Sequence, residues 1–273
     1  MKIDVVVPIY NAYDVLKDCL NSLIKYQTQV SNIILINDAS TDQRMKSYLD
    51  RIAYENKWNI IHQNKNMGFV HTANCGLKLS KNHTVLLNSD TIVTKPWIAA
   101  FKSALKNNPT LGTATPWSNN AEICSFPQFL FNQPPIKDIN KFAKQLFKHH
   151  RPRYPNLPTA VGFCMLVSKK AKKLVGYLDE GHFGHGYGEE NDYSMRVANA
   201  GLKNLLCDNA YVAHIGNQSF SDFGLSPNED TMKRLLEKHP NYLSLIQKFI
   251  NLDPLSPIRS EILTIVKNYK IKL

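Results

Sequence analysis

The stretch VVVPIYNAYDVLKDCLNSL, residues 5–23, decides the fold. A run of β-branched residues that ends at Ile9 is typical of a buried strand, and the apolar residues that follow recur at helical spacing on one face. Farther along the chain, short apolar runs alternate with helix-like segments, at 33–36, 43–56, 60–61, 69–80 and 84–88. This βαβαβ order predicts an α/β protein with a mostly parallel central sheet and helices on both faces.

The pattern weakens after residue 115. Prolines are frequent between residues 116 and 158, and we interpret this stretch as an excursion over the sheet that contains a helix at 138–148. A strand at 160–167 and a helix at 169–175 are expected to return the chain to the domain.

The last part of the chain is predicted to be helical. Helix breaks are expected at Pro240, Pro254 and Pro257. We therefore predict one domain over residues 1–225, which includes the excursion at 116–158, and a C-terminal helical extension over 226–273.

Composition limits the class of protein. A chain of 273 residues with 43% hydrophobic and 20% charged residues can bury a substantial core, which excludes disorder as a description of the whole. The five cysteines are scattered and odd in number, which favours a reducing, cytosolic setting over a disulfide framework or a zinc site. No apolar stretch approaches the roughly 20 residues of a membrane span, and the N-terminus does not have the pattern of a signal peptide.

The net charge of +11 points to anionic partners or to a solvated basic surface. Aromatic residues are not interleaved with the lysines in any nucleic-acid-binding motif, so we expect no nucleic-acid partner. Two basic segments, the excursion at 137–153 and the tail after Pro254, are candidates for peripheral contact with an anionic membrane, at the inner face of the cytoplasmic membrane.

Small polar or acidic residues follow three of the predicted strands. Ligands of parallel sheets bind beyond the carboxyl ends of the strands, so three such endings on one edge favour a ligand site over ordinary turn chemistry. The endings are Pro8 to Asn11, Asn37 to Ser40, and Asn88 to Asp90.

Two residues are candidate metal ligands. Asp90 follows an apolar strand and could hold Mg²⁺ or Mn²⁺ through oxygen, although helix capping would also explain it. His214 follows the strand-like segment 205–213, and an imidazole beside a carboxylate suits Mn²⁺; a hydrogen-bonded structural histidine is the alternative.

Three acids, Glu189, Glu190 and Asp192, lie within FGHGYGEENDYSMR at 183–196. A carboxylate crowded by others has a raised pKa and can serve as a general base near neutral pH. The alternative is a charged first helical turn favoured by the helix dipole, with Asp192 in a surface pair with Arg196.

Six ordered segments resemble the family 2 glycosyltransferases of the GT-A fold. They are VVVPIYNAYDVLKDCLNSL, ILINDASTD, NKNMGFVHTANCGL, VLLNSDT, GYGEENDYSMRVANAG and AHIGNQSF, covering about residues 3 to 222. TPWSNNAEICSFP and VGFCMLVS are similar to the bacterial branch that builds surface polysaccharides. The resemblance implies a Rossmann-like nucleotide-binding domain that transfers a sugar from a nucleotide-sugar.

The resemblance also implies nucleotide contacts. The residues implied are Pro8, Tyr10 and Asn11 in the first turn, Asp38 with Ser40 at the nucleobase of the donor, Asn66, Gly68 and Asn74 under the nucleotide-sugar, and Asn88 with Ser89. The nucleotide is expected to be UDP, with dTDP as the alternative.

The same resemblance implies the metal ligands and the catalytic base. Asn88 replaces the first acid of the family's metal motif, so Asp90 is expected to bind Mn²⁺ or Mg²⁺ with His214 and the donor's diphosphate. Glu190 matches the catalytic base with one more methylene than the usual Asp, and Glu189 and Asp192 are its rivals.

These assignments predict a single displacement with inversion. The acceptor is expected to be a glycan or a polyprenyl-diphosphate-linked saccharide, used in capsule, O-antigen or other surface polysaccharide synthesis. Trp117, Asn119 and Asn120 are candidate sugar or acceptor contacts, with core packing of Trp117 as an alternative. A non-catalytic module that binds nucleotide-sugar or glycan is the competing hypothesis.

Overall fold

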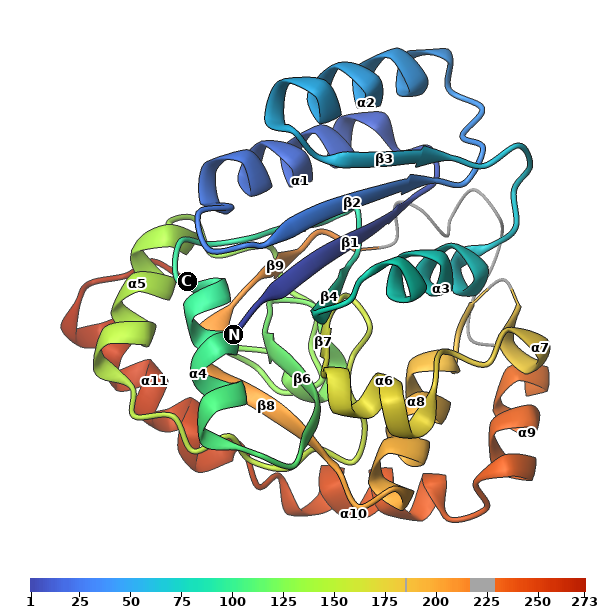
Figure 1. Cartoon of the computed structure of the whole chain (residues 1–273). Helices are drawn as coiled ribbons and strands as arrows, with labels where there is room; N and C mark the ends of the chain where they lie inside the picture. Colours follow the sequence, from blue (N-terminus) through green and yellow to red (C-terminus); the bar gives the residue numbers. More distant parts are fainter. Residues whose placement is uncertain (185, 217–228) are drawn as a thin grey trace.

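A computed structural model describes residues 1–184, 186–216 and 229–273, and its centre is a sheet of seven strands (Figure 1). The strand order is β3-β2-β1-β4-β7-β6-β8. The strands are β1 (Ile3–Ile9), β2 (Asn32–Asn37), β3 (Asn59–His62), β4 (His83–Leu87), β6 (Leu111–Trp117), β7 (Cys164–Val167) and β8 (Lys203–Tyr211). A small second sheet pairs β5 (Thr91–Ile92) with β9 (Ala213–His214).

The large sheet is mostly parallel, as predicted. Strands β3, β2, β1 and β4 run parallel, and so do β6 and β8, whereas β7 is antiparallel to β4 and β6. Parallel strands present their carboxyl ends at one edge, which brings the loops after β1, β2 and β4 together.

The helices follow the predicted alternation. In the described residues they are α1 (Tyr13–Tyr26), α2 (Gln43–Asn56), α3 (Phe69–Leu79), α4 (Trp97–Asn107), α5 (Ile139–His149), α6 (Lys169–Val175), α7 (Glu180–Phe183), α8 (Glu189–Asn199), α9 (Glu229–Lys238), α10 (Tyr242–Leu252) and α11 (Ser256–Asn268), with a 3₁₀ turn at Glu122–Cys124.

The two faces of the sheet carry separate apolar clusters. Side chains alternate along β1, so that Val5 and Val7 pack under α1, α2, α4, α5 and α11, while Val6 packs with α3, α6 and α8. Continuous burial of β1 on both faces explains why its sequence reads as an unbroken apolar run rather than an alternating one.

One predicted strand is shorter than expected. Ladder pairing begins at Cys164, and the predicted strand residues 160–163 lie outside it. Hydroxyl groups take the backbone amides there: the N–H of Ala160 donates to Ser194 Oγ at 2.9 Å and the N–H of Val161 to Thr115 Oγ1 at 3.1 Å. This departure of residues 160–163 from the sheet places Gly162 and Phe163 at the candidate site described below.

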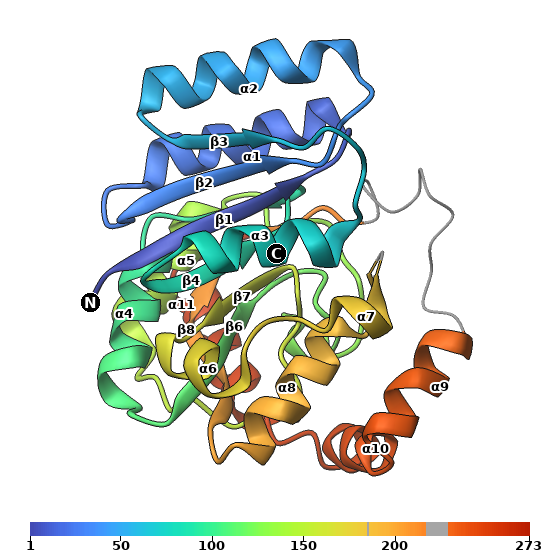
Figure 2. The ribbon, with the colours of Figure 1, turned by 45° about the vertical axis from the view of Figure 1, so that its right-hand side comes forward.

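The C-terminal helices lie against the rest of the protein. Figures 1 and 2 show α9 and α10 on the outer side of α8, and α11 beside α5. Pro257 does not break a helix, because it occupies the first turn of α11, where a missing N–H is tolerated. The predicted boundary at residues 225 and 226, and residues 217–220 of the AHIGNQSF segment, lie outside the described residues. No helix in the described part of the chain has both the length and the apolar character needed to cross a bilayer.

Candidate functional site

The loop after β1 is fixed to the loop after β2. Asn11 Oδ1 accepts hydrogen bonds from the backbone N–H groups of Thr41 and Asp42 at 2.9 and 3.2 Å. The N–H of Asn11 donates to Ser40 Oγ at 2.9 Å. Asn11 and Ser40 therefore build the turn, with Pro8 buried inside β1 and Tyr10 half-buried at its end.

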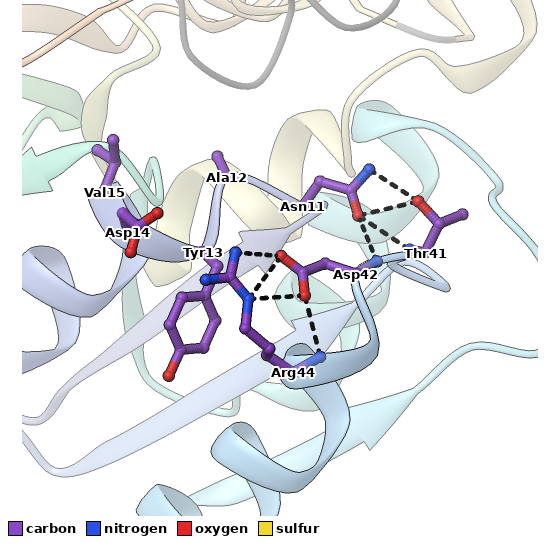
Figure 3. A pocket seen from close by; sticks show the side chains of 8 residues that line it. All are labelled: Asn11, Ala12, Tyr13, Asp14, Val15, Thr41, Asp42 and Arg44. Atoms are coloured by element: carbon purple, nitrogen blue, oxygen red, sulfur yellow. Dashed lines mark hydrogen bonds and ion pairs between the residues drawn. The ribbon is translucent and has the colours of Figure 1, made fainter.

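A surface pocket of about 480 Å³ opens beside this turn (Figure 3). Arg44 forms one of its walls, lying over the ring of Tyr13 at 4.2 Å and pairing with Asp42 at 2.6 Å. The pocket shows that the turn is accessible from solvent.

Asp38 joins the second strand to the loop before α3. Its carboxylate accepts hydrogen bonds from the N–H groups of Met67 and Gly68 at 2.7 and 2.9 Å. Gly68 has a φ of 87°, a conformation that glycine adopts without strain. Asn66 Oδ1 also accepts from the N–H of Gly68, while Asn66 Nδ2 is buried and has no hydrogen-bond partner among the described residues. An unpaired amide group at this edge is available to a ligand.

Asn74, predicted to lie under the nucleotide-sugar, is buried and bonded within the protein. It is 3% exposed, and its amide exchanges two hydrogen bonds with the backbone of Leu178, at 2.9 and 3.0 Å. Its side chain therefore ties α3 to the loop before α7.

Asp90 and His214 lie together at the junction of β5 and β9. Thr91 pairs with His214 in this small sheet, and the N–H of Ile215 donates to the carbonyl of Asp90. Asp90 Oδ1 lies 3.4 Å from His214 Nε2. This oxygen is buried and, within the described residues, accepts no hydrogen bond. Asn88 and Ser89 precede it, half-buried and buried respectively.

The ring of His214 has a fixed orientation. Its Nδ1 lies 2.7 Å from the carbonyl oxygen of Asn120, which can only accept, so Nδ1 carries a proton and Nε2 points toward Asp90. Phe163 stacks on the ring at 5.2 Å. Burial acts to lower the pKa of His214, but the Asp90 carboxylate outweighs it and the pKa is raised.

This pair fits a divalent metal ion. A buried carboxylate oxygen without a donor, beside an imidazole nitrogen held by a second hydrogen bond, is the arrangement seen around protein-bound metals. A mixed oxygen and nitrogen donor set suits Mn²⁺. Within residues 1–184, 186–216 and 229–273, no group of three or more His, Cys, Asp or Glu side chains could hold a metal, whereas this pair could supply two ligands.

The first turn of α8 holds the acids. The turn begins after Gly188, whose φ of 90° is left-handed, and a β-carbon there would lie 3.1 Å from Phe183 and Thr231. Glu189 is 5% exposed, and its Oε2 has no hydrogen-bond partner among the described residues. Glu190 is partly exposed, and Asn191 Nδ2 donates to its Oε1 at 3.2 Å.

Both glutamates have raised pKa values. Burial raises the pKa of Glu189 to about 7. Burial, followed by the charges of Glu189 and Glu122, raises the pKa of Glu190 well above its ordinary value. A raised pKa makes each of these carboxyl groups a stronger base, when ionised, than an ordinary glutamate.

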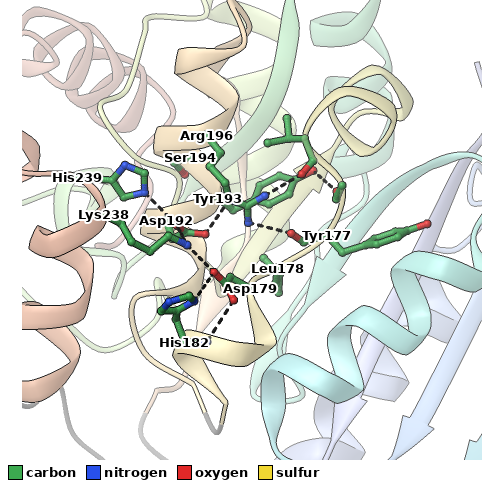
Figure 4. Close-up of polar contacts among 12 residues, drawn as sticks. Tyr177, Leu178, Asp179, His182, Asp192, Tyr193, Ser194, Arg196, Lys238 and His239 are labelled. Carbon is green, nitrogen blue, oxygen red and sulfur yellow. Dashed lines mark hydrogen bonds and ion pairs between the residues drawn. The ribbon is translucent and has the colours of Figure 1, made fainter.

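Asp192 is not a candidate base, contrary to its place among the rivals. Its side chain is 0% exposed and contacts Lys238 at 2.6 Å, Arg196 at 2.8 Å and His239 at 2.9 Å (Figure 4). Burial acts to raise its pKa, but hydrogen bonds from Lys238 and His239 and the charge of Arg196 lower it. The predicted pair with Arg196 exists, but it is buried rather than a surface pair.

The metal pair and the acid pair are neighbours. Phe163 stacks on His214 and its carbonyl accepts from the N–H of Asn88, while a β-carbon on the adjacent Gly162 would lie 3.7 Å from Glu190 Cγ. The loop after β6 contributes to both pairs. The carbonyl of Asn120 bonds His214, and the charge of Glu122 raises the pKa of Glu190.

Two of the predicted sugar contacts are buried and bonded within the protein. Trp117 is 0% exposed, and its indole N–H donates to the carbonyl of Asp208 at 3.1 Å, so it is a core residue. Asn119 is 2% exposed and uses its amide to bond both the N–H and the carbonyl of His214, at 3.0 and 2.9 Å. Asn119 therefore positions the candidate metal ligand. Asn120 is half-buried beside Gly216 and remains a candidate contact.

Four residues of the acid site were not predicted from sequence. They are Glu122, Thr159, Asn191 and Tyr242. Asn191 alone was adjacent to a predicted residue, and the others come from distant segments.

The mostly parallel seven-stranded sheet with its flanking helices is the GT-A fold of glycosyltransferases. A solved structure of GalNAc-T7 with UDP, GalNAc and Mn²⁺ is similar over 100% of this chain and 55% of that chain, with a TM-score of 0.67 and 16% identity. The family model described as Glycosyl transferase family 2 matches residues 4–175, which is more than half of the chain. The chain belongs to this family.

Curated relatives are also glycosyltransferases and polymer synthases. The chain is 32% identical over 97 residues to glycosyltransferase GlyG of Streptococcus pneumoniae, covering 35% of this chain and 32% of that protein. It is 35% identical over 148 residues to the teichoic acid poly(glycerol phosphate) polymerase of Staphylococcus epidermidis, covering 54% of this chain and 19% of that protein. The matched stretches thus span a third or less of these relatives.

Proposed function

We propose that this glycosyltransferase transfers one sugar, with inversion at the anomeric carbon, from a nucleoside-diphosphate sugar to a glycan or lipid-linked saccharide. The observation that carries the proposal is the adjacency of the Asp90 and His214 pair to the Glu189 and Glu190 pair through Gly162 and Phe163. A group that binds a diphosphate and a group that removes a proton are the two requirements of this reaction.

Glu190 is the proposed general base. It is the glutamate of the pair that keeps part of its surface exposed, so an acceptor hydroxyl can reach it, whereas Glu189 is buried. Its raised pKa makes it a strong enough base when ionised to accept the proton of that hydroxyl. One base without an evident nucleophile supports a single displacement, and hence inversion.

Asp90 and His214 are the proposed protein ligands of Mn²⁺ or Mg²⁺. The bound ion would neutralise negative charge on the departing nucleoside diphosphate. Asn88, the residue in place of the family's first acid, is proposed to contribute through its position in the loop rather than as a charged ligand.

The donor is proposed to carry UDP, with dTDP as the alternative. Asp38 is the proposed hydrogen-bond acceptor for the nucleobase of the donor. Each of its carboxylate oxygens accepts one backbone N–H and retains capacity for a second hydrogen bond. The UDP and Mn²⁺ in the GalNAc-T7 structure support this choice by similarity of fold. The teichoic acid polymerase relative supports a role in bacterial surface polymer synthesis, capsule and O-antigen included.

The test is nucleoside diphosphate release from a panel of nucleotide-sugars, with Mn²⁺, Mg²⁺ or EDTA, for the wild type, Asp90→Asn and His214→Ala. We expect release from one donor, loss of release with EDTA, and at least a tenfold higher Mn²⁺ requirement in both variants. A wild type that binds nucleotide without releasing diphosphate, even with lipid extract as acceptor source, would favour the non-catalytic binding module instead.

We also propose peripheral contact with an anionic membrane, on its cytoplasmic side. The two basic segments meet in the structure, because α5 packs against α11 and Tyr269 stacks on His149 at 4.7 Å. The exposed lysines there are Lys137, Lys141, Lys144, Lys148, Lys267, Lys270 and Lys272. Each lysine near an anionic surface contributes on the order of 1 kcal/mol. Equal flotation with neutral and anionic vesicles would contradict this proposal.

We propose that residues 1–225 form the transferase domain and that 226–273 form an extension that supports it. The contacts of α9 and α10 with α8 favour such a supporting role.

A further inference from the structure

A tyrosine of the C-terminal extension reaches the helix that carries the acids. Tyr242, the first residue of α10, is 7% exposed, and its hydroxyl donates to Asn191 Oδ1 at 2.9 Å. Thr159 Oγ1 donates to the same oxygen at 2.7 Å. Asn191 Nδ2 in turn donates to Glu190 Oε1 at 3.2 Å. Three segments that are far apart in sequence therefore meet at one amide.

The chemistry of these groups fixes which way the Asn191 amide faces. An ionised carboxylate only accepts hydrogen bonds, so the NH₂ group must face Glu190. The two hydroxyl groups can donate, and they meet the amide oxygen on the other side. Burial, followed by the charges of Glu190 and Glu122, raises the pKa of Tyr242, so its hydroxyl remains a donor.

Glu190 has an electrostatic environment that disfavours its charge. After burial, the charges of Glu189 of the same helix and Glu122 of the 3₁₀ turn raise its pKa, and the charge of Glu190 in turn raises the pKa values of Tyr187 and Tyr242. Backbone hydrogen bonds from Glu190 and Gly188 act in the opposite direction, and the hydrogen bond from Asn191 also stabilises the ionised carboxylate.

We propose that Tyr242 is a positioning residue for the catalytic base, acting through Asn191. The hydroxyl of Tyr242 holds the amide of Asn191, and the amide in turn holds Oε1 of Glu190 in place. The C-terminal extension thereby becomes part of the catalytic apparatus rather than only of the folded core. This inference rests on the proposed role of Glu190.

The test compares Tyr242→Phe and Asn191→Ala with the wild type. Tyr242→Phe keeps the buried ring and removes only the hydroxyl. Loss of the neutral hydrogen bond between Tyr242 and Asn191 predicts about a threefold to tenfold lower kcat with an unchanged donor KM. The acid limb of the pH profile should move to higher pH, because the ionised form of Glu190 loses stabilisation. In Asn191→Ala the additional Tyr242→Phe change should have no further effect, since the coupling runs through Asn191.

Tyr269→Phe is the matched control, because it removes a hydroxyl that contacts His149 elsewhere on the extension. It should leave kcat and the pH profile unchanged. Additive effects of Tyr242→Phe and Asn191→Ala, or a lower Tm in Tyr242→Phe with an unmoved pH profile, would overturn the inference.

A carbon-13 titration of the Glu190 carboxyl makes the test independent of turnover. We expect its pKa to be higher in Tyr242→Phe than in the wild type and in Tyr269→Phe. An unmoved Glu190 pKa rejects the inference even if the enzyme is active. If the pKa moves but no donor is turned over, the proposed function fails while the positioning contact stands.

Discussion

Two acids on one helical turn have pKa values that are shifted in opposite directions. Asp192 and Glu190 are two residues apart on α8, where Asp192 is buried and Glu190 is partly exposed. Asp192 contacts Arg196, Lys238 and His239, and its pKa is lowered. Glu190 has two acids as its charged neighbours, and its pKa is raised.

The direction of the pKa shift distinguishes an acid with a structural role from an acid suited to catalysis. A carboxylate surrounded by cations is stable as an anion and a poor proton acceptor, so it serves to hold elements together. A carboxyl group crowded by other acids gains a proton readily and is suited to general base catalysis. The cluster EEND therefore contains a catalytic candidate and a structural anchor, which sequence proximity alone does not distinguish.

The largest expected effect lies on the Glu190 side. Glu190→Gln should lower kcat by about 10² to 10⁴, the usual contribution of a general base, without loss of nucleotide binding. Glu189→Gln is the matched control. It should retain activity and move the acid limb of the pH profile to lower pH, because it removes a negative charge next to Glu190. Steady-state kinetics across pH checks both, and an active Glu190→Gln with an inactive Glu189→Gln would reverse the assignment.

The next effect lies on the Asp192 side and concerns stability. Asp192→Asn removes the buried carboxylate that Arg196, Lys238 and His239 contact, and breaking a buried ion pair in this way costs about 3 to 5 kcal/mol. Urea unfolding measures the loss. Asp50→Asn, which removes a half-exposed partner of His62, should change the midpoint little. Equal midpoints for Asp192→Asn and the wild type would mean that the cluster does not hold α9 to α8.

The sequence predicted the sheet and most helices because periodicity is a local property. The apolar run at Ile3–Ile9 and the helical spacing after it appear in the structure as β1 and α1. The predicted strand before Cys164 failed for a nonlocal reason, since hydroxyl groups of Thr115 and Ser194 capture its amides.

Burial was the property that sequence could not supply at the site. Trp117, Asn119 and Asn74 have side chains that suit a sugar ligand, yet all three are at most 3% exposed and bonded internally. The contact between Tyr242 and Asn191 spans 51 residues, and no motif marks either partner. Residues of this kind are identified only once the chain is folded.

The smallest predicted effect concerns the acid stability of the anchor. Lys238 bonds Asp179 as well as Asp192, at 2.5 and 2.6 Å. Burial acts to raise the pKa of Asp179, but the hydrogen bonds from Lys238 and His182 together with the charge of Lys238 outweigh it and lower the pKa from 3.8 to about 2. A folded pKa below the unfolded one gives stability that is complete above the unfolded pKa and lost as pH falls through the folded pKa.

Wild-type stability should therefore fall between about pH 4 and pH 2, and Lys238→Met should flatten this fall by about 1 kcal/mol, a figure reduced for the partial exposure of the pair. Glu189 does not interfere in this window, because its pKa is raised to about 7 and its effect appears as pH rises from acid toward neutral. Urea unfolding at pH 5 and pH 2.5 measures the difference. If Lys238→Met loses as much stability as the wild type between these two pH values, then Lys238 does not set the pKa of Asp179. The contrast between the pKa values of Asp192 and Glu190 would then rest on Arg196 and His239 alone.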